Sequence, residues 1–418
     1  MNRLRFSLAI SLGAAAIVPA FGDIMDRPSG IKIGERMTLR PYVSVSLSYD
    51  QNINGRGGTG ASGNDGDFMW SISPSLSLDY KAENWSLLLD GHYNYNQYFR
   101  NDNHDESYHS FGESLRWNWS SSSGADKGWS FTIGEMFDQR TMSDDMISEN
   151  GEHNYGGASR TLTAEAALQR RFNEKLNAGI NGSVYWLDRD GDKNDNYGAF
   201  FGWSRWTVGA QAGYAVSPWL NFMLSGSYQG YTQENTDNTD IDGNSRGLSV
   251  QGGITSYMTE RISYQVLAGW SRFSYGDGES TSDGFVYTIS GNWKIGESWN
   301  TMLMATSYYQ PSEYELASKT RTDAVSWGLS KTMVRGKLRA TLDVRYNRNT
   351  NESVDDSYDE YVINVLSGRL GLNYSFNRYL SVFVNGEYQR SFNSDSDNRY
   401  GAYDYDRWRI SAGFGLSY

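Results

Sequence analysis

The chain ends on the stretch Trp408-Arg409-Ile410-Ser411-Ala412-Gly413-Phe414-Gly415-Leu416-Ser417-Tyr418. Every second residue is apolar, and the residues between them are Arg, Ser, Gly, Gly and Ser. Side chains of a β-strand alternate between two faces, so one face of this strand is apolar and the other is small or polar. The stretch therefore predicts an amphipathic strand whose apolar face needs either a second sheet or an apolar solvent.

The aromatic end of this strand favours the apolar solvent. Phe414, Leu416 and Tyr418 form the apolar series, and no polar tail follows them. This pattern is typical of the closing strand of an outer-membrane β-barrel. It predicts a protein that is inserted through this strand by the barrel-assembly machinery. The expected surroundings are the outer-membrane lipids of a diderm, Gram-negative-type bacterium.

The N-terminus predicts secretion. Arg3 and Arg5 form a basic region, residues 8–18 are apolar, and Ala20-Phe21-Gly22 offers small residues for cleavage. We interpret residues 1–22 as a signal peptide rather than a membrane anchor, because the apolar region is too short to span. Residues 23–36 are then a short periplasmic segment and residues 37–418 the barrel. The absence of cysteine excludes a lipoprotein and a disulfide framework.

Composition agrees with a large barrel. The chain has 30 Tyr, 14 Trp and 17 Phe, yet its mean hydropathy is −0.62. Only alternate residues of a barrel face lipid, whereas its lumen and loops are polar and aromatic side chains gather at the two interfaces. The net charge of −12 argues against nucleic acid as a partner.

A repeating hairpin pattern gives the strand number. Eight short turns, which we assign to the periplasmic side, are each followed by an apolar residue: 82–84, 125–128, 173–175, 217–218, 259–261, 296–298, 335–337 and 377–379. Nine longer segments rich in Asp, Asn, Gly and Ser lie between them: 51–66, 101–106, 141–156, 189–196, 233–245, 276–283, 312–320, 350–358 and 393–403. The fold class is therefore all-β. We expect a transmembrane antiparallel β-barrel of about 18 strands (roughly 16–20), with short periplasmic turns and long acidic outer loops.

Alternation varies between the predicted strands. It is clean in 37–50, 68–80, 338–346 and 380–388, and poor in 197–214, 299–309 and 359–375. A bulge, a glycine-rich contact inside the barrel and a wrong register each account for poor alternation.

The predicted lumen is wide and charged. About 18 strands close to a diameter of roughly 35 Å, which side chains alone do not fill, so we expect a water-filled pore. Acidic pore-lining candidates come early in the chain, namely Asp79, Asp90, Asp138 and Glu165. Basic candidates come late, namely Arg339, Arg345, Arg369, Arg407 and Arg409, with Arg40 beside them through closure. Opposed acidic and basic walls would orient small polar solutes. The alternative is that the charges are scattered at random over a polar surface. Asp343 and Glu387 favour this alternative, because they are acidic residues among the late, basic candidates.

Two further features stand out. The loop 138–155 carries Asp144, Asp145 and Glu149 beside apolar residues, so it either folds inward as a constriction or stays solvated. Glu113 and Glu135 fall on faces assigned to lipid, directly opposite each other if the turn centres near residue 124. Three explanations remain open: the carboxyl groups are protonated, they are buried in a contact between protomers of a homo-oligomer, or their strands have another register than the one assumed.

No catalytic motif is recognisable. The chain has four His, and none stands in a convincing catalytic arrangement. We therefore predict no enzyme activity, no cofactor-binding residues and no metal ligands.

The first predicted strand carries a family resemblance. Residues 39–52, LRPYVSVSLSYDQN, resemble the opening of a family of β-barrel porins often called outer-membrane β-barrel proteins, with an Arg-Pro, an alternating strand and a Tyr-Asp-x-Asn end. The resemblance implies an outer-membrane barrel, sometimes linked to exopolysaccharide export.

We predict a porin or channel for passive diffusion of small polar solutes. One alternative is an adhesive or structural surface barrel with an occluded lumen. The other is the outer-membrane component of a polysaccharide export assembly.

Overall fold

The computed structural model describes most of the predicted barrel. It covers residues 30–51, 66–99, 108–121, 128–140, 158–190, 202–233, 244–275, 280–311, 318–353, 361–393 and 405–418. The regular elements in these ranges are β-strands. No helix in the same ranges is long and apolar enough to cross a membrane.

The strands are long for a globular protein. Apart from the three-residue β1, each has 13 to 16 residues, enough to cross a bilayer when tilted. They are β1 (Ile31–Ile33), β2 (Met37–Asp50), β3 (Asp67–Lys81), β4 (Trp85–Tyr98), β5 (Tyr108–Ser120), β6 (Gly128–Arg140), β7 (Ala158–Arg171), β8 (Leu176–Asp190), β9 (Trp203–Ser217), β10 (Leu220–Gln233), β11 (Ser245–Thr259), β12 (Ile262–Tyr275), β13 (Ser280–Ile295), β14 (Trp299–Pro311), β15 (Ser318–Met333), β16 (Leu338–Ser353), β17 (Tyr361–Ser375), β18 (Leu380–Asn393) and β19 (Tyr405–Ser417).

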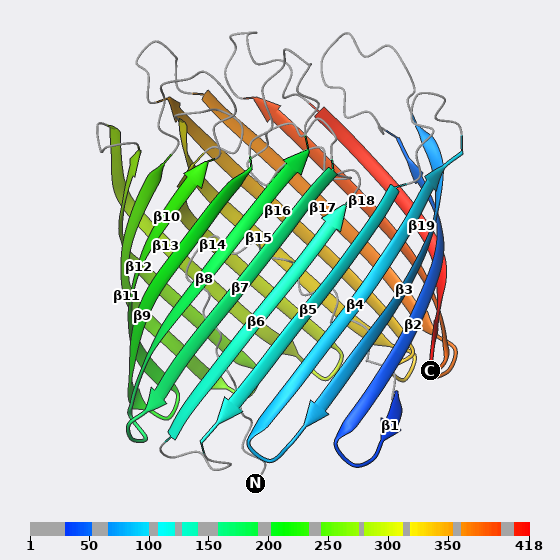
Figure 1. Ribbon diagram of the computed structural model, residues 1–418, viewed down its shortest axis with the longest axis horizontal. Coiled ribbons are helices and arrows are strands. Elements are labelled where there is room, and N and C mark those ends of the chain that lie inside the picture. The colour runs from blue at the N-terminus through cyan, green and yellow to red at the C-terminus, as the bar shows by residue number, and fades with distance from the viewer. Residues whose placement is uncertain are drawn as a thin grey trace.

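The sheet closes on itself. Each strand from β2 to β19 pairs antiparallel with its neighbours in the sequence, and β19 returns to β2 from Arg409↔Asp50 to Ser417↔Tyr42. Figure 1 shows the result, with blue β2 beside red β19 and all strands tilted. Within the described ranges the barrel has 18 strands, as predicted. The extra strand β1 pairs with the start of β2, inside the segment 23–36 that we expected to be periplasmic.

Seven of the eight predicted turns lie within the described residues, whereas the turn 125–128 and the nine predicted outer loops fall mostly outside them. Each of the eight predicted turns joins an odd-numbered strand to the next even-numbered one, from β3–β4 to β17–β18. Several turns are fixed by a short polar side chain. Asn173 Oδ1 accepts hydrogen bonds from the backbone N–H groups of Lys175 and Leu176, both at 2.8 Å. Asn377 and Thr259 act in the same way in their own turns.

The strand register separates two faces. Leu47 pairs with Trp70 and Ala412, and this face exposes large apolar side chains around the barrel. Ser48 pairs with Met69 and Ser411 on the opposite face, which is mostly polar. The apolar face is the lipid face and the polar one is the lumen face.

Strands β11 and β12 approach each other closely at two glycines, a place that we call the corner. Gly253 and Gly269 lie on the lumen face there, and a Cβ on either would come within 1.9 Å of a backbone oxygen of the next strand. A residue with a side chain cannot be accommodated so close to a neighbouring backbone, so glycine permits this corner.

Next to the corner, the wall overlaps itself. The pairing of β13 with β14 stops at Tyr287↔Ser307, although β13 continues to Ser280 beside β12 and β14 continues to Pro311 beside β15. Tyr309 of β14 packs in a buried cluster with Phe273 and Val286, which lie on the lumen face of β12 and β13. The outer end of β14 therefore passes inside β13.

This geometry explains the poor alternation of three predicted strands. Tyr361, Ile363 and Val365 of β17 are apolar, buried and on the lumen face. Trp203 of β9 lies on the lumen face and packs against the buried cluster, and Met302 and Met304 of β14 lie on the lumen face as well. In each case apolar side chains occupy lumen positions, which removes the simple apolar-polar alternation.

Candidate functional site: the charged lumen wall

The register places the ten predicted pore-lining side chains on the lumen face. Acidic members are Asp79 on β3, Asp90 on β4, Asp138 on β6 and Glu165 on β7. Basic members are Arg40 on β2, Arg339 and Arg345 on β16, Arg369 on β17, and Arg407 and Arg409 on β19. Their role in lining a conducting pore stays a prediction.

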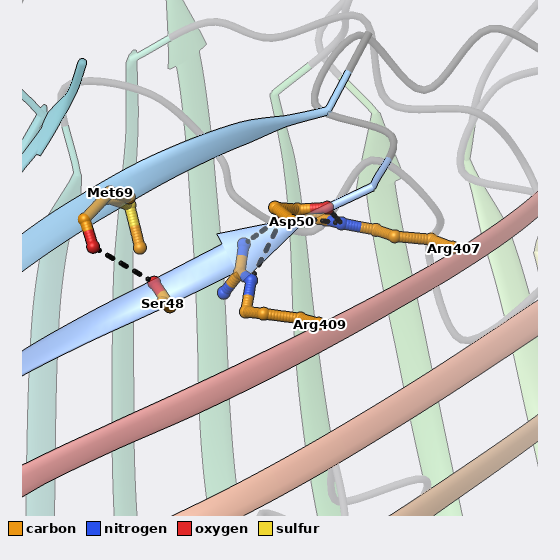
Figure 2. A network of polar contacts seen from close by, with 5 residues as sticks. All are labelled: Ser48, Asp50, Met69, Arg407 and Arg409. Atoms are coloured by element: carbon orange, nitrogen blue, oxygen red, sulfur yellow. Dashed lines mark hydrogen bonds and ion pairs between the residues drawn. The ribbon is translucent and has the colours of Figure 1, made fainter. Parts of the chain in front are cut away.

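Asp50, at the end of β2, is bound by two arginines. It is 0% exposed and accepts hydrogen bonds from Arg407 and Arg409 (Figure 2). The Arg407 Nε lies 2.9 Å from each carboxylate oxygen, and Arg409 donates to Oδ2 through Nε and Nη2 at 3.0 and 2.9 Å. Two arginines from the last strand thus bind one carboxylate of the first barrel strand, across the closure of the barrel.

Asp50 belongs to a row of charges that we call the lumen ladder. Its members face one another across successive strand pairs, from β16 to β3: Asp343, Arg369, Glu387, Arg409, Asp50 and Asp67. Signs alternate along the row except at its last step. Because Asp50 and Asp67 are the terminal residues of their strands, the ladder rises from the body of the lumen to the loop end.

The middle of the ladder is accessible from the lumen. Arg369 Nε lies 3.3 Å from Glu387 Oε1, and these side chains are 51% and 43% exposed. Solvent screens such a pair, so its contribution to stability is small, about 0–1 kcal/mol. These two side chains are partly exposed on the lumen face.

Ion pairs also join the two predicted walls. Arg40, from the expected basic wall, pairs with Asp79, from the acidic wall, at 3.4 Å. In the acidic wall itself, Asp138 pairs with Arg140 at 3.0 Å and Glu165 with Arg116 at 3.4 Å. Neighbouring side chains thus compensate these charges locally, which favours the scattered alternative, and the orientation of solutes by opposed walls stays a prediction.

The loop end of the lumen wall is buried. Thr320 and Thr322 of β15 and Asn349 of β16 face the lumen but have no exposed surface. Each threonine donates its hydroxyl to an asparagine across the strand pair, Thr322 to Asn349 at 2.9 Å. These lumen positions are covered, in contrast to the half-exposed ladder pair.

Sequence reasoning did not select Asp50, Asp67 or Arg116 as pore-lining candidates, and it named Glu387 only as an exception to the separation of charges. Asp50, Asp67, Glu387 and Arg116 all lie on faces that alternation assigns to the lumen, so their location was readable. Their pairing was not, because it depends on which residues meet across strands. Among the residues that the structure describes, no group of three His, Cys, Asp or Glu side chains is placed to hold a metal ion.

The proposed constriction lies beyond the described part. Asp144, Asp145 and Glu149 fall in 141–157, outside the residues that the structure describes. Their inward or solvated position therefore stays a prediction.

Glu113 and Glu135 are on the lipid face, but they are not opposite each other. Glu113 pairs with Phe137, and Glu135 pairs with Leu115. The two glutamates are thus diagonal neighbours, because the β5–β6 pairing centres on residue 125 rather than 124. Both side chains are exposed on the outside of the wall, near the middle of their strands. Their burial in a protomer contact stays a prediction.

The comparisons agree with this architecture. A family model described as "Putative beta-barrel porin 2" matches residues 26–417. The chain belongs to this family. It is an outer-membrane β-barrel protein of a Gram-negative bacterium, and the resemblance of its first strand is confirmed.

Solved structures share the barrel at low sequence identity. The FrpB iron transporter from Neisseria meningitidis is 10% identical with a TM-score of 0.46, over 92% of this chain and 82% of FrpB. The siderophore receptor PirA from Pseudomonas aeruginosa is 9% identical with a TM-score of 0.43, over 93% and 81% of the two chains. No curated protein matches the sequence.

Proposed function

We propose that the porin-family barrel is a passive channel for small polar solutes and carries out no chemical reaction. The observation that carries this proposal is the half-exposed charged pair Arg369–Glu387 on the lumen face. A second half-exposed pair, Arg116–Glu165, lies on the lumen face of β5 and β7. Solvated charges on strands far apart in the barrel fit a wall that faces water.

Local charge compensation predicts weak selectivity. Each exposed charge of these pairs stands beside an opposite one, so the wall offers donors and acceptors without a strong net field. A polar solute can exchange its hydration for these groups and move on by diffusion. Ionic solutes of either sign should pass at similar rates.

Liposome swelling tests passive diffusion. Refolded full-length barrel in liposomes should admit arabinose faster than sucrose, and sucrose faster than raffinose, because a water-filled lumen sieves by size. The Arg369→Gln/Glu387→Gln variant should keep this order, since no tight binding site is required. A folded, heat-modifiable barrel that admits none of these sugars would overturn the proposal.

A second candidate is a surface barrel with an occluded lumen. The burial of Thr320, Thr322 and Asn349 at the loop end favours it, because an open mouth would leave these side chains wet. This candidate predicts no swelling with any sugar, whereas the channel predicts the graded rates above.

A further inference from the structure

Charged residues of the lipid face are arranged differently at the two ends of the barrel. At the loop end, four arginines each stand directly opposite an aspartate on the adjacent strand. We call them the outer Arg–Asp pairs: Arg160↔Asp188, Arg272↔Asp283, Arg348↔Asp323 and Arg390↔Asp406. They lie on β7–β8, β12–β13, β15–β16 and β18–β19, so they recur around much of the wall.

These pairs lie toward the loop end of their strands, and the deepest pair is Arg348 and Asp323, each the sixth residue from that end. Arg160 and Asp188 are each the third residue from the loop end of their strands, and Arg272 and Asp283 the fourth. Arg272, Arg348 and Arg390 are exposed on the outside of the wall. Arg160 is half-exposed and reaches Asp188 at 3.7 Å between Nη1 and Oδ2.

The turn end has another arrangement. There, basic side chains of the lipid face lie over aromatic rings: Arg170 is 4.8 Å from the Trp129 ring and Lys331 is 4.2 Å from the Trp299 ring. Arg378 lies 4.5 Å from the Tyr379 ring in the last turn. Cation–π contacts give these basic groups a partner within the wall. One such contact also occurs at the loop end, where Arg390 lies 5.6 Å from the Phe392 ring, so the two ends differ in their arginine–aspartate pairs rather than in cation–π contacts alone.

An aspartate does not use all the donors of an arginine. A guanidinium carries five N–H donors in a planar fork, and one carboxylate can accept only part of them. Donors left facing lipid are costly unless a headgroup accepts them. Phosphate is the acceptor that matches this fork best, because it accepts two parallel charge-assisted hydrogen bonds.

The surface below the pairs suits acyl chains. Leu248 pairs with Arg272 on the lipid face, and Trp270 and Phe285 lie one step nearer the membrane centre. All three are exposed. The Trp270 indole donates to Asp283 at 3.0 Å, which ties the apolar surface to the charged pair above it.

We propose that the outer Arg–Asp pairs bind the phosphorylated headgroups of lipids in the outer leaflet. The arginine of each pair donates to phosphate, and in the first pair Asp188, 3.7 Å from Arg160, helps to hold the arginine against the wall. The protein carries a net charge of −12, so attraction to an anionic surface must come from local basic groups such as these. This surface is independent of whether the lumen conducts.

Lipid binding to the purified full-length barrel tests the proposal. The probes are diphosphoryl lipid A and a phosphate-free glycolipid with the same acyl chains, added to the barrel in detergent micelles and followed by native mass spectrometry. The test variant is Arg160→Gln/Arg272→Gln/Arg348→Gln/Arg390→Gln. The matched control is Arg170→Gln/Lys331→Gln/Arg378→Gln, which removes basic groups at the turn end.

The expected result is a selective loss. Affinity for diphosphoryl lipid A should fall about fivefold for each arginine removed, so on the order of several hundredfold in the test variant, and less than about threefold in the control. Affinity for the phosphate-free glycolipid should not change. If the fourfold variant does not fold, Arg272→Gln and Arg390→Gln alone should each show the fivefold loss.

Three outcomes would overturn the proposal. The first is equal affinity of parent and test variant for diphosphoryl lipid A. The second is an equal loss in the control variant. The third is full displacement of the lipid by inorganic phosphate at equal concentration, which would mean a simple anion site without a lipid headgroup.

Discussion

Asp50 lies where the first and last strands of the barrel meet on the lumen side. Its buried carboxylate accepts hydrogen bonds from Arg407 and Arg409, both in β19. A buried charge is stable only when it is paired and its lone pairs are satisfied. The side chain therefore stabilises closure and compensates two arginines at once.

Replacing Asp50 should weaken the barrel. Asp50→Asn keeps the shape but leaves the two arginines without their counter-charge, which should cost about 3 kcal/mol of unfolding free energy. Urea unfolding of the refolded barrel in lipid vesicles measures this. Asp90→Asn, which removes a lumen carboxylate opposite Ser77 and Ser114, is the control and should change little. An unchanged urea midpoint in Asp50→Asn would contradict a role in closure.

Glu113 and Glu135 lead to a prediction about oligomers. A carboxylate facing hydrocarbon should cost about 1 kcal/mol or more, and a second copy of the chain could shield both. We predict that the parent barrel is oligomeric in mild detergent and that Glu113→Leu/Glu135→Leu shifts it toward monomers. Sedimentation of the detergent complexes gives the mass. Glu165→Leu on the lumen face is the control, and a monomeric parent would show that no such contact exists.

At the scale of elements, the sheet departs from a regular barrel between β11 and β14. Gly253 and Gly269 permit the close approach of β11 and β12 at the corner, and the outer end of β14 passes inside β13. Tyr309 then covers the lumen face of β12 and β13. We call the boundary between β13 and β14 the seam. In its outer part, side-chain packing rather than continuous strand pairing holds the two strands together.

The corner should not tolerate a side chain. Gly269→Ala would place its Cβ within 1.9 Å of the Val250 carbonyl oxygen, so strands β11 and β12 could not approach each other as they do. We expect the variant to refold poorly, seen as loss of the heat-modifiable band in gel electrophoresis. Gly91→Ala, whose Cβ would meet nothing within 4 Å, should refold like the parent. Equal refolding of both variants would contradict the corner.

The seam should loosen when its anchor is removed. Tyr309→Ala deletes a buried aromatic ring, which should cost about 3 kcal/mol. Amide hydrogen exchange should become faster in residues 308–310 than in residues 300–304, which still pair with β13. Tyr388→Ala on the lipid face is the control. Uniform exchange along β14 would show that Tyr309 does not hold the seam.

For the whole molecule, the sequence was sufficient for the architecture and insufficient for side-chain partners. Turn residues and alternation depend on local chemistry, so strand number, turns and the lumen face of Asp79 or Arg369 were predictable. Charge pairing depends on contacts between strands, so Arg40–Asp79 and Arg407–Asp50 were not. The position of the outer end of β14 inside β13 could not be predicted either. Alternation assigns Tyr309 to the lipid face, yet its side chain lies on the inner side of β13.

The measurement that tests the central claim most directly is single-channel conductance of the refolded barrel in a planar bilayer in potassium chloride. We predict stable conductance steps with weak ion selectivity, and a shift toward cations in Arg369→Glu, since this change places two carboxylates at an exposed lumen position. A correctly folded, heat-modifiable barrel that inserts and gives no conductance would contradict the account of an open channel.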